Sequence, residues 1–279
     1  MLRSRGHFVG IMGWPLDFTL SPAIHGAAFR NLGLDWVYLE WSVEPARLGE
    51  AVAGLRALGA AGANVTMPHK ESVAEFVDEL SGDARALRAV NTIQRVGDKL
   101  VGHNTDVDGF REFLVADAGV EVSGKEALVL GAGGAARAVV RALSDLGAAR
   151  VRIAARRPER GRVVVELVPA IAAEVVNWES AGEAASGSDI VVNATPVGAS
   201  PRRPVLSGVP WRPGQVVCDL VYSPPTTPLM QEARAKGAEC WGGLGMLIHQ
   251  AALSFRIWTG KNPSIEAMSA AAVRAIGAH

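Results

Sequence analysis

The sequence predicts an α/β protein in which an N-terminal α/β domain with a mainly parallel sheet is joined to a doubly wound domain of the Rossmann type. Apolar segments of strand length alternate with helix-like segments along most of the chain, which favours parallel strands joined by crossover helices. A Gly-rich turn at 131–136 connects one such strand to a helix. The length of 279 residues suits two small domains.

The first domain begins with a strand and a helix, and this alternation then continues. Pro22 suits the first turn of the first helix, because proline has no N–H to donate there. The segment that starts at Trp36 alternates as a strand does, and the next one has helical spacing. The expected elements are a strand at 7–13, a helix after Pro22, a strand at 36–43, a helix at 45–58 and a strand at 62–66.

The end of the first domain is predicted to contain a helix and two short strands. Residues 69–88 have a helical pattern. Two extended pieces follow at 91–96 and 99–105, separated by the turn-like dipeptide Gly97-Asp98. We expect the domain to close near residue 105.

A second series of strands and helices starts at Glu126 and is typical of a doubly wound domain. Two C-terminal helices, at 246–258 and 264–276, are expected to return to the first domain. The predicted boundaries are therefore 1–105 with 244–279 for a substrate-binding catalytic domain, and 106–243 for a nucleotide-binding domain. The strands of the second domain are expected within ALVL (127–130), VRIAARR (151–157), DIVVNAT (189–195) and QVVCDLVY (215–222).

Composition and charge exclude several classes of protein. The chain is 49% hydrophobic and 20% charged, which is typical of a globular protein and not of a disordered one. Its 28 basic and 28 acidic residues cancel, so the strong positive field of a nucleic-acid or anionic-membrane binder is absent. We expect a small molecule as the partner, and neither nucleic acid nor membrane.

The cysteines, the histidines and the N-terminus point to a metal-free cytoplasmic protein. Cys218 and Cys240 lie in apolar stretches without CxxC spacing, and the six histidines form no metal-binding pattern. We therefore expect no metal and no disulfide. The apolar run within residues 1–13 is broken by glycines and is too short for a signal peptide or a membrane span.

The sharpest local signal is GAGGAA at 131–136, which follows a strand and opens a helix. It fits the dinucleotide-binding pattern with Gly131, Gly133 and Ala136. Gly131 permits the tight turn, Gly133 lets a pyrophosphate approach the backbone, and the N–H groups of the helix start attract phosphates. The alternative is a Gly-rich turn without a ligand, which the strand-turn-helix context disfavours.

The next strand ends in Arg156 and Arg157, with Arg160 nearby, at the place where an NAD-binding domain carries an acid for the ribose hydroxyls. Arginines suit a 2′-phosphate instead. We interpret the cluster as selection of NADP, although Glu159 lies close and a solvated basic loop is the alternative.

Seven motifs carry a more specific signal, and together they resemble the ordered signature of the shikimate dehydrogenase family over essentially the whole chain. This resemblance implies NADPH-dependent reduction of 3-dehydroshikimate to shikimate in aromatic amino-acid biosynthesis. It also implies an α/β substrate domain, a Rossmann NADP-binding domain and C-terminal helices that return to the first domain. The motifs are TLSPAIH (19–25), NVTMPHK (64–70), AVNTI (89–93), GHNTDVDG (102–109), NATPVG (193–198), DLVYSPPTTPL (219–229) and GLGMLIHQA (243–251).

The same resemblance implies roles for individual residues. Lys70 and Asp106 are the implied catalytic pair, since hydride reduction of a ketone leaves an alkoxide that a lysine beside a carboxylate can protonate. The implied substrate-binding residues are Thr19, Ser21 and Tyr222 for the carboxylate, and Thr66, Asn91 and Gln250 for ring hydroxyls. The implied cofactor-binding residues are Gly131, Gly133, Gly134, Ala135, Ala136, Arg156, Arg157, Arg160, Thr195, Gly243 and Met246.

Several alternatives stay open at this point. Taken alone, Lys70 is typical of a surface lysine, and Thr19 and Ser21 are typical of turn or N-cap residues before a helix. The family usually has serine at the position of Thr19, histidine at that of Phe18, and Asn-Arg-Thr at 155–157. A quinate or aminoshikimate dehydrogenase, which Thr19 motivates, and a non-catalytic NADP-binding sensor are therefore rival functions. We expect a monomer or a homodimer.

Overall fold

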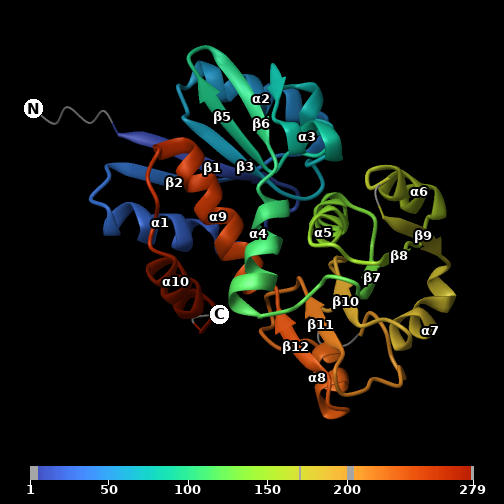
Figure 1. The fold of residues 1–279 in the computed structure, drawn as a ribbon. Coiled ribbons are helices and arrows are strands. Elements are labelled where there is room, and N and C mark those ends of the chain that lie inside the picture. The colour runs from blue at the N-terminus through green and yellow to red at the C-terminus, as the bar shows by residue number, and fades with distance from the viewer. Residues whose placement is uncertain (1–5, 170, 200–203, 278–279) are drawn as a thin grey trace, which may run out of the picture. The chain divides into compact units, whose positions relative to one another are not determined.

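The structure is a computed structural model that describes residues 6–169, 171–199 and 204–277. Residues 1–5, part of the N-terminal run considered above, lie outside the described residues. The chain forms two compact units, Met1–Thr105 with Ile248–His279 and Asp106–Leu247. Each unit contains a six-stranded sheet with helices around it (Figure 1), which confirms the predicted α/β class.

The sheet of the first unit has the strand order β2-β1-β3-β5-β6-β4. Strand β1 pairs in parallel with β2 and β3, whereas β5 runs antiparallel to both of its neighbours. The predicted turn joins β5 to β6, and Gly97 in it has a φ of 61°, which a glycine adopts without strain. The strands are β1 (His7–Gly13), β2 (Trp36–Ser42), β3 (Gly62–Val65), β4 (Glu79–Leu80), β5 (Thr92–Val96) and β6 (Lys99–His103).

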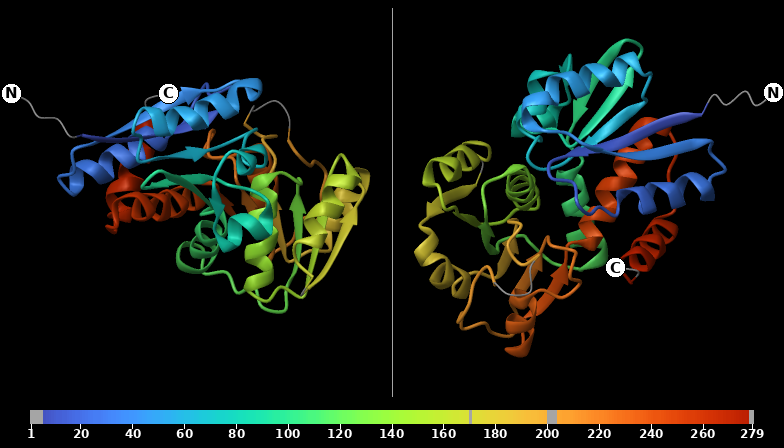
Figure 2. Two further views of the ribbon diagram at one scale, coloured as in Figure 1. Left: turned by 90° about the horizontal axis from the view of Figure 1, so that it is seen from above. Right: turned by 180° about the vertical axis from the view of Figure 1, so that it is seen from behind.

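Helices cover both faces of this sheet, as the two views of Figure 2 show. Ala63 and Val65 of β3 join the core beneath α2 and α3. Asn64, which lies between them, points to the opposite face and donates to Ser254 of α9, because successive side chains of a strand alternate. The helices of this unit are α1 (Ser21–Asn31), α2 (Leu48–Ala57), α3 (Gly82–Leu87), the part of α9 (Leu244–Thr259) from Ile248 onward, and α10 (Ile265–Gly277).

The predicted helix over residues 69–88 is wrong. The segment instead contains a short 3-10 helix (Ser72–Glu75), the strand β4 and the helix α3. Asp78 accepts a hydrogen bond from Leu100 N at 2.6 Å, and β4 pairs in parallel with β6. Pairing with a strand further along the chain thus overrides the local helical preference.

The C-terminal helices return to the first unit, as predicted. Trp258 Nε1 of α9 donates to Ile93 O at 2.9 Å, and Gln94 Nε2 donates to Ile257 O at 2.7 Å. Gly62 makes room for this contact, because a Cβ there would lie 2.5 Å from the indole nitrogen of Trp258. Helix α10 packs against α1.

The second unit has the strand order β12-β11-β10-β7-β8-β9, with all neighbouring strands parallel. This is the order of a Rossmann domain, which confirms the prediction. Two of its strands, β9 and β12, were not predicted, because neither has a long apolar run. The strands are β7 (Glu126–Leu130), β8 (Arg150–Ala154), β9 (Ala172–Val176), β10 (Ile190–Asn193), β11 (Val216–Asp219) and β12 (Glu239–Gly242).

The helices of the second unit bury both faces of its sheet. Ala181 of α7 and Leu229 of α8 share a core with Leu128 and Val191 of the strands. Helix α5 packs against β7 and against α4 and α6. None of the described helices is long and apolar enough to cross a membrane. The helices are α4 (Asp106–Glu112), followed by a short π-helix (Phe113–Asp117), α5 (Gly134–Asp145), α6 (Pro158–Glu166), α7 (Ala181–Ser186) and α8 (Pro228–Ala235).

Candidate active site

The loop after β3 carries two of the predicted site residues, Thr66 and Lys70. Thr66 N donates to Met12 O at 2.9 Å, and Val90 N donates to Lys70 O at 2.7 Å. Gly13 allows the close approach, because a Cβ there would lie 2.5 Å from Thr66 Cγ2. The backbone of the loop is therefore held at both ends, while the Thr66 and Lys70 side chains are only half-buried.

Asn91 and Gln250, the two amides predicted to bind ring hydroxyls, lie together in the first unit. Asn91 is 2% exposed, and its Nδ2 lies 3.3 Å from Gln250 Oε1. Asn91 Oδ1 accepts from Thr105 N at 2.8 Å, and Asn91 Nδ2 donates to Thr105 Oγ1 at 2.9 Å. These bonds fix which end of the Asn91 amide is oxygen.

A cluster of buried hydroxyl and amide groups supports Asn91, and the sequence analysis missed it. Ser254 Oγ lies 2.7 Å from Thr92 Oγ1 and 3.2 Å from Thr105 Oγ1, and it accepts from Asn64 Nδ2 at 3.1 Å. The available signal was the spacing of Ser254 four residues after Gln250, which places both on one helix face.

Thr19 and Ser21 lie together at the start of α1. Thr19 Oγ1 accepts from Ser21 N and donates to Ser21 Oγ, both at 3.2 Å. The N-cap residue of α1 is Leu20, and no side chain caps the helix. The N-cap alternative for these two hydroxyls is therefore wrong, whereas the bond from Ser21 N to Thr19 Oγ1 fits the turn alternative. Their role toward a substrate carboxylate stays a prediction.

His25, one turn further along α1, is a buried titratable group that the sequence analysis assigned no role. Its ring stacks on Tyr38 with centroids 4.5 Å apart and lies near the rings of Phe255 and Trp258. Burial lowers the pKa of His25 to about 3. Tyr38 in turn donates to Asn64 Oδ1 at 2.7 Å, which connects this aromatic cluster to the polar groups around Asn91.

We expect stability to fall as the pH is lowered from 7 to 5. Below its ordinary pKa of about 6.5, His25 binds a proton in the unfolded chain but stays neutral in the folded one, so protons favour unfolding. The cost is about 2 kcal/mol at pH 5. Thermal unfolding at the two pH values measures it. His25→Phe should reduce this decline in stability. A smaller decline should remain in the variant, because burial also lowers the pKa of His103.

The exposed His7 provides the control for this experiment. His7→Gln should retain the wild-type dependence of stability on pH, because folding does not bury His7. Equal slopes for wild type and His25→Phe would contradict the assignment to His25.

Asp106 and Tyr222 belong to the second unit. Asp106 is the first residue of α4, directly follows Thr105 and is 3% exposed. Burial raises the pKa of the Tyr222 phenol, which keeps it a neutral hydroxyl donor. The pairing of Lys70 with Asp106 stays a prediction.

The Gly-rich turn of the second unit has the geometry that a dinucleotide requires. Gly131 has a φ of 111°, and a Cβ there would lie 3.1 Å from Thr195 Cγ2. Gly133 is the N-cap residue of α5, no side chain caps this helix, and a Cβ at Gly133 would enter open space. Gly134 and Ala135 form the first helical turn, and Ala136 is buried behind them. These features fit a nucleotide pyrophosphate.

Thr195 lies in the turn after β10, next to Gly131. Thr195 N and Oγ1 donate to Asn193 Oδ1 at 3.0 and 2.7 Å, and Asn193 Nδ2 donates to Asp219 Oδ1 at 2.8 Å. Burial raises the pKa of Asp219, and its hydrogen bonds oppose that rise. The sequence analysis named Thr195 but missed Asn193 and Asp219, whose signal is a polar residue at the end of each of two neighbouring strands.

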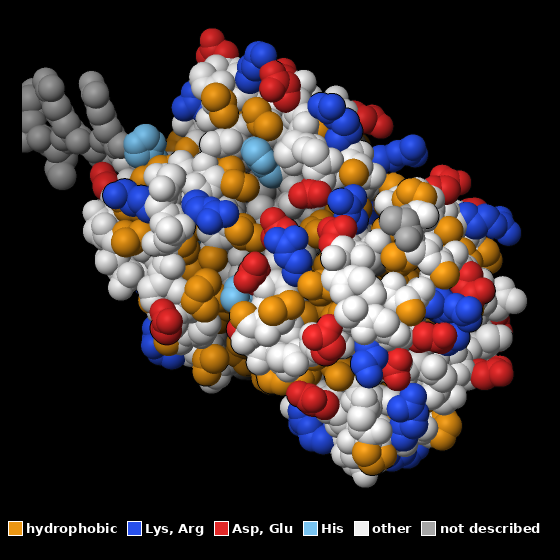
Figure 3. Space-filling model, in the orientation of Figure 1, with side chains coloured by type: hydrophobic (Ala, Val, Ile, Leu, Met, Phe, Trp, Pro, Cys, Tyr) orange, Lys and Arg blue, Asp and Glu red, His pale blue; other side chains and the backbone are white. Residues whose placement is uncertain are grey.

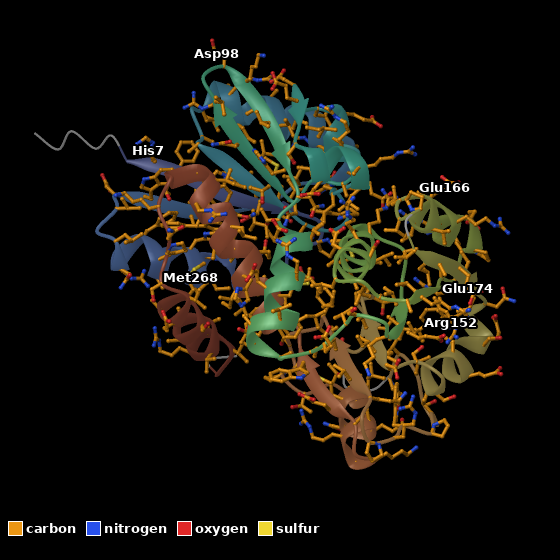
Figure 4. All side chains as sticks on the ribbon, in the orientation of Figure 1. His7, Asp98, Arg152, Glu166, Glu174 and Met268 are labelled. Atoms are coloured by element: carbon orange, nitrogen blue, oxygen red, sulfur yellow. The ribbon has the colours of Figure 1, made fainter. Side chains whose placement is uncertain are left out.

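The arginines after β8 differ in their surroundings from Arg152 within it. Arg152 lies between two carboxylates, with Nη2 2.6 Å from Glu126 Oε2 and Nε 3.4 Å from Glu174 Oε1. Figure 4 labels Arg152 and Glu174. Arg156 and Arg157 are exposed, and within the described part of the chain neither forms an ion pair. Arg160 is half-buried in α6. Among the residues that the structure describes, Arg156 and Arg157 therefore have no ion-pair partner to give up when they meet a phosphate.

Gly243 and Met246 also belong to the second unit. A Cβ on Gly243 would lie 2.1 Å from Leu220 O, so only glycine lets this segment pass the end of β11. Met246 is buried in the first turns of α9. Their part in cofactor binding stays a prediction.

The structure also shows how charged groups and possible metal ligands are distributed. On the face shown in Figure 3, basic and acidic side chains are interspersed and form no large surface of one sign. No cluster of three or more histidines, cysteines or acids that could hold a metal occurs among the residues the structure describes.

Comparisons with known proteins place the chain in a family. Three family models match successive parts of it: the shikimate dehydrogenase substrate binding domain at 11–93, the shikimate / quinate 5-dehydrogenase at 114–201 and the shikimate 5′-dehydrogenase C-terminal domain at 243–273. The shikimate dehydrogenase (NADP(+)) of Methanothermobacter thermautotrophicus is 41% identical over 99% of each chain. The chain belongs to the shikimate dehydrogenase family.

Solved structures of the shikimate dehydrogenase family have the same fold. The Thermus thermophilus shikimate 5-dehydrogenase, in complex with NADP(H) and shikimate, is 38% identical with a TM-score of 0.87, over 96% of this chain and 99% of that one. The quinate dehydrogenase of Corynebacterium glutamicum, in complex with NAD, is 31% identical with a TM-score of 0.88, over 96% and 99%. Shikimate dehydrogenases and a quinate dehydrogenase therefore share this fold.

Proposed function

We propose that the chain is an NADP-dependent shikimate dehydrogenase, which interconverts shikimate and 3-dehydroshikimate. The observation that carries this proposal is the match along almost the entire chain to a relative of that name. The buried amide of Asn91, the half-buried amide of Gln250 and the open Gly-rich turn are consistent with a polyhydroxylated substrate and a dinucleotide.

The cofactor site is built from the second unit. When bound, NADP supplies or takes up the hydride. Gly131 and Gly133 leave the backbone N–H groups of α5 open to the pyrophosphate, and the dipole of the helix favours its negative charge. Arg156 and Arg157 hold the 2′-phosphate through charge-assisted hydrogen bonds.

The first unit supplies most of the substrate contacts. The hydroxyl groups of Thr19, Ser21 and Tyr222 donate hydrogen bonds to the substrate carboxylate. These groups add no charge that an empty site would have to neutralise. Thr66, Asn91 and Gln250 bind the ring hydroxyls.

Lys70 and Asp106 carry out the proton transfer. As the substrate hydroxyl is oxidised, its oxygen loses a proton, which Lys70 accepts and returns in the reverse reaction. Asp106 orients Lys70 and accepts a hydrogen bond from a substrate hydroxyl. Fixing the backbone around Lys70 limits the movement needed to reach that oxygen.

An absorbance assay at the reduced-nicotinamide band tests the proposal. Purified protein should reduce NADP with shikimate, with a higher kcat/KM than for NAD or for quinate. Binding of NADP without turnover on either substrate would refute the dehydrogenase and favour a cofactor-binding sensor.

A quinate dehydrogenase is the second candidate. Thr19, in place of serine, adds a methyl group where the substrate carboxylate is bound, and a quinate dehydrogenase is among the structural neighbours. In the same assay, a higher kcat/KM for quinate than for shikimate would establish this candidate. A cytoplasmic location, and a monomer or homodimer that binds no nucleic acid, stay predictions.

A further inference from the structure

We propose that Asp219, acting through Asn193, is a positioning residue that holds the turn carrying Thr195 and the loop carrying Tyr222 in place. The inference rests on the proposed function, in which Thr195 touches the cofactor and Tyr222 the substrate carboxylate. Asp219 itself touches neither ligand in this proposal.

The Asn193 amide uses all of its hydrogen-bonding capacity. Its Oδ1 accepts from Thr195 N and Thr195 Oγ1, and its Nδ2 donates to Val197 O at 2.9 Å and to Asp219 Oδ1 at 2.8 Å. Rotating the amide by half a turn would set donor against donor and acceptor against acceptor. The amide therefore fixes the turn around Thr195 in one conformation.

Asp219 holds the next loop at both of its ends. Its Oδ1 also accepts from Val221 N at 3.1 Å, directly before Tyr222, and its Oδ2 accepts from Thr227 Oγ1 at 2.7 Å. Thr227 is the N-cap residue of α8, with its hydroxyl 3.4 Å from Met230 N. One carboxylate thus links the ends of the loop that carries Tyr222 to the turn that carries Thr195.

Burial makes this linkage strong. Asn193, Asp219 and Thr227 are each 0% exposed, so water cannot replace a lost partner. Hydrogen bonds to a charged acceptor are about twice as strong as neutral ones, and an unpaired buried donor is costly. Removing the carboxylate would leave three buried donors without their acceptor.

Two substitutions at Asp219 separate positioning from general stability. Asp219→Ala removes every acceptor, and we expect it to weaken NADP binding about tenfold and to raise the KM for shikimate. Asp219→Asn keeps an oxygen toward Asn193 and Val221, so it should restore most of the NADP affinity. Calorimetric titration with NADP alone measures this affinity and does not depend on turnover.

Gln215→Ala is the matched control at the opposite end of β11. Gln215 is also 0% exposed, and its Nε2 donates to Ala185 O at 3.0 Å and to Ser188 O at 2.7 Å. This variant should lower the melting temperature but leave NADP affinity and the KM for shikimate at their wild-type values.

Failure of the positioning role and failure of the proposed function give different experimental results. If wild type fails to oxidise shikimate, that function is refuted, while the NADP titrations still test the link from Asp219 to Thr195. NADP affinity of Asp219→Ala within about twofold of wild type, or equal weakening in Gln215→Ala, would overturn the positioning role.

If Asp219→Ala does not fold, substitutions at Thr227 test the loop. Thr227→Val should raise the KM for shikimate, and Thr227→Ser, which keeps the hydroxyl, should not. Equal values for the two variants would contradict the proposal.

Discussion

Lys70→Ala should fold and bind NADP but oxidise shikimate about 10²- to 10⁴-fold more slowly than wild type. Without the amine, the proton of the reacting hydroxyl has no positioned acceptor, and water replaces it poorly. Because Lys70 is only half-buried, we expect the change to cost little stability. Steady-state kcat, together with the NADP dissociation constant, measures the effect.

Lys99→Ala provides a matched control in the same unit. Lys99 is exposed and pairs with Glu79, with Nζ 2.6 Å from Oε1, and exposed pairs of this kind contribute little to stability. This variant should keep wild-type kcat. Unchanged turnover in Lys70→Ala would contradict the proton-transfer role proposed for Lys70.

Arg156→Ala should raise the KM for NADP by about tenfold to a hundredfold and leave the KM for NAD almost unchanged. The loss corresponds to a hydrogen bond between charged groups, about 1.5–3 kcal/mol. Only NADP carries the 2′-phosphate, so the effect is specific to it. The remaining Arg157 and Arg160 should limit the loss, and initial rates with each cofactor measure it.

Arg162 offers the control for net charge. It is exposed on helix α6, which follows the loop that carries Arg156 and is predicted to bind the phosphate. Arg162→Ala should leave the ratio of the two KM values close to that of wild type. If Arg156→Ala changes both KM values equally, Arg156 does not select the phosphate.

The parts of the fold that the sequence predicted are those with strong local patterns. Strand β1, helix α1 after Pro22 and the turn before α5 each have a pattern within a few residues. Strand β4 does not, because its two residues are determined by pairing with β6. The edge strand β9 is half-exposed and lacks the continuous apolar run of a central strand.

The candidate site likewise contains residues that the sequence predicted and residues that only the fold reveals. Asn91 and Gln250 stand in motifs and were predicted, whereas Ser254 lies outside the motifs and contacts Asn64, which is 190 residues away in sequence. His25 was assigned no role from the sequence, and its aromatic surroundings come from α1, β2 and α9 together. Such groups are recognisable only once the chain has folded.

The discontinuity of the first unit has a consequence for synthesis on the ribosome. Residues 1–105 emerge first, but Trp258 and Phe255, which cover one face of their sheet, follow only after the whole second unit. The second unit is continuous in sequence and can complete its core while the first still exposes apolar surface. We expect the nascent first unit to depend on chaperones until the last helices leave the exit tunnel.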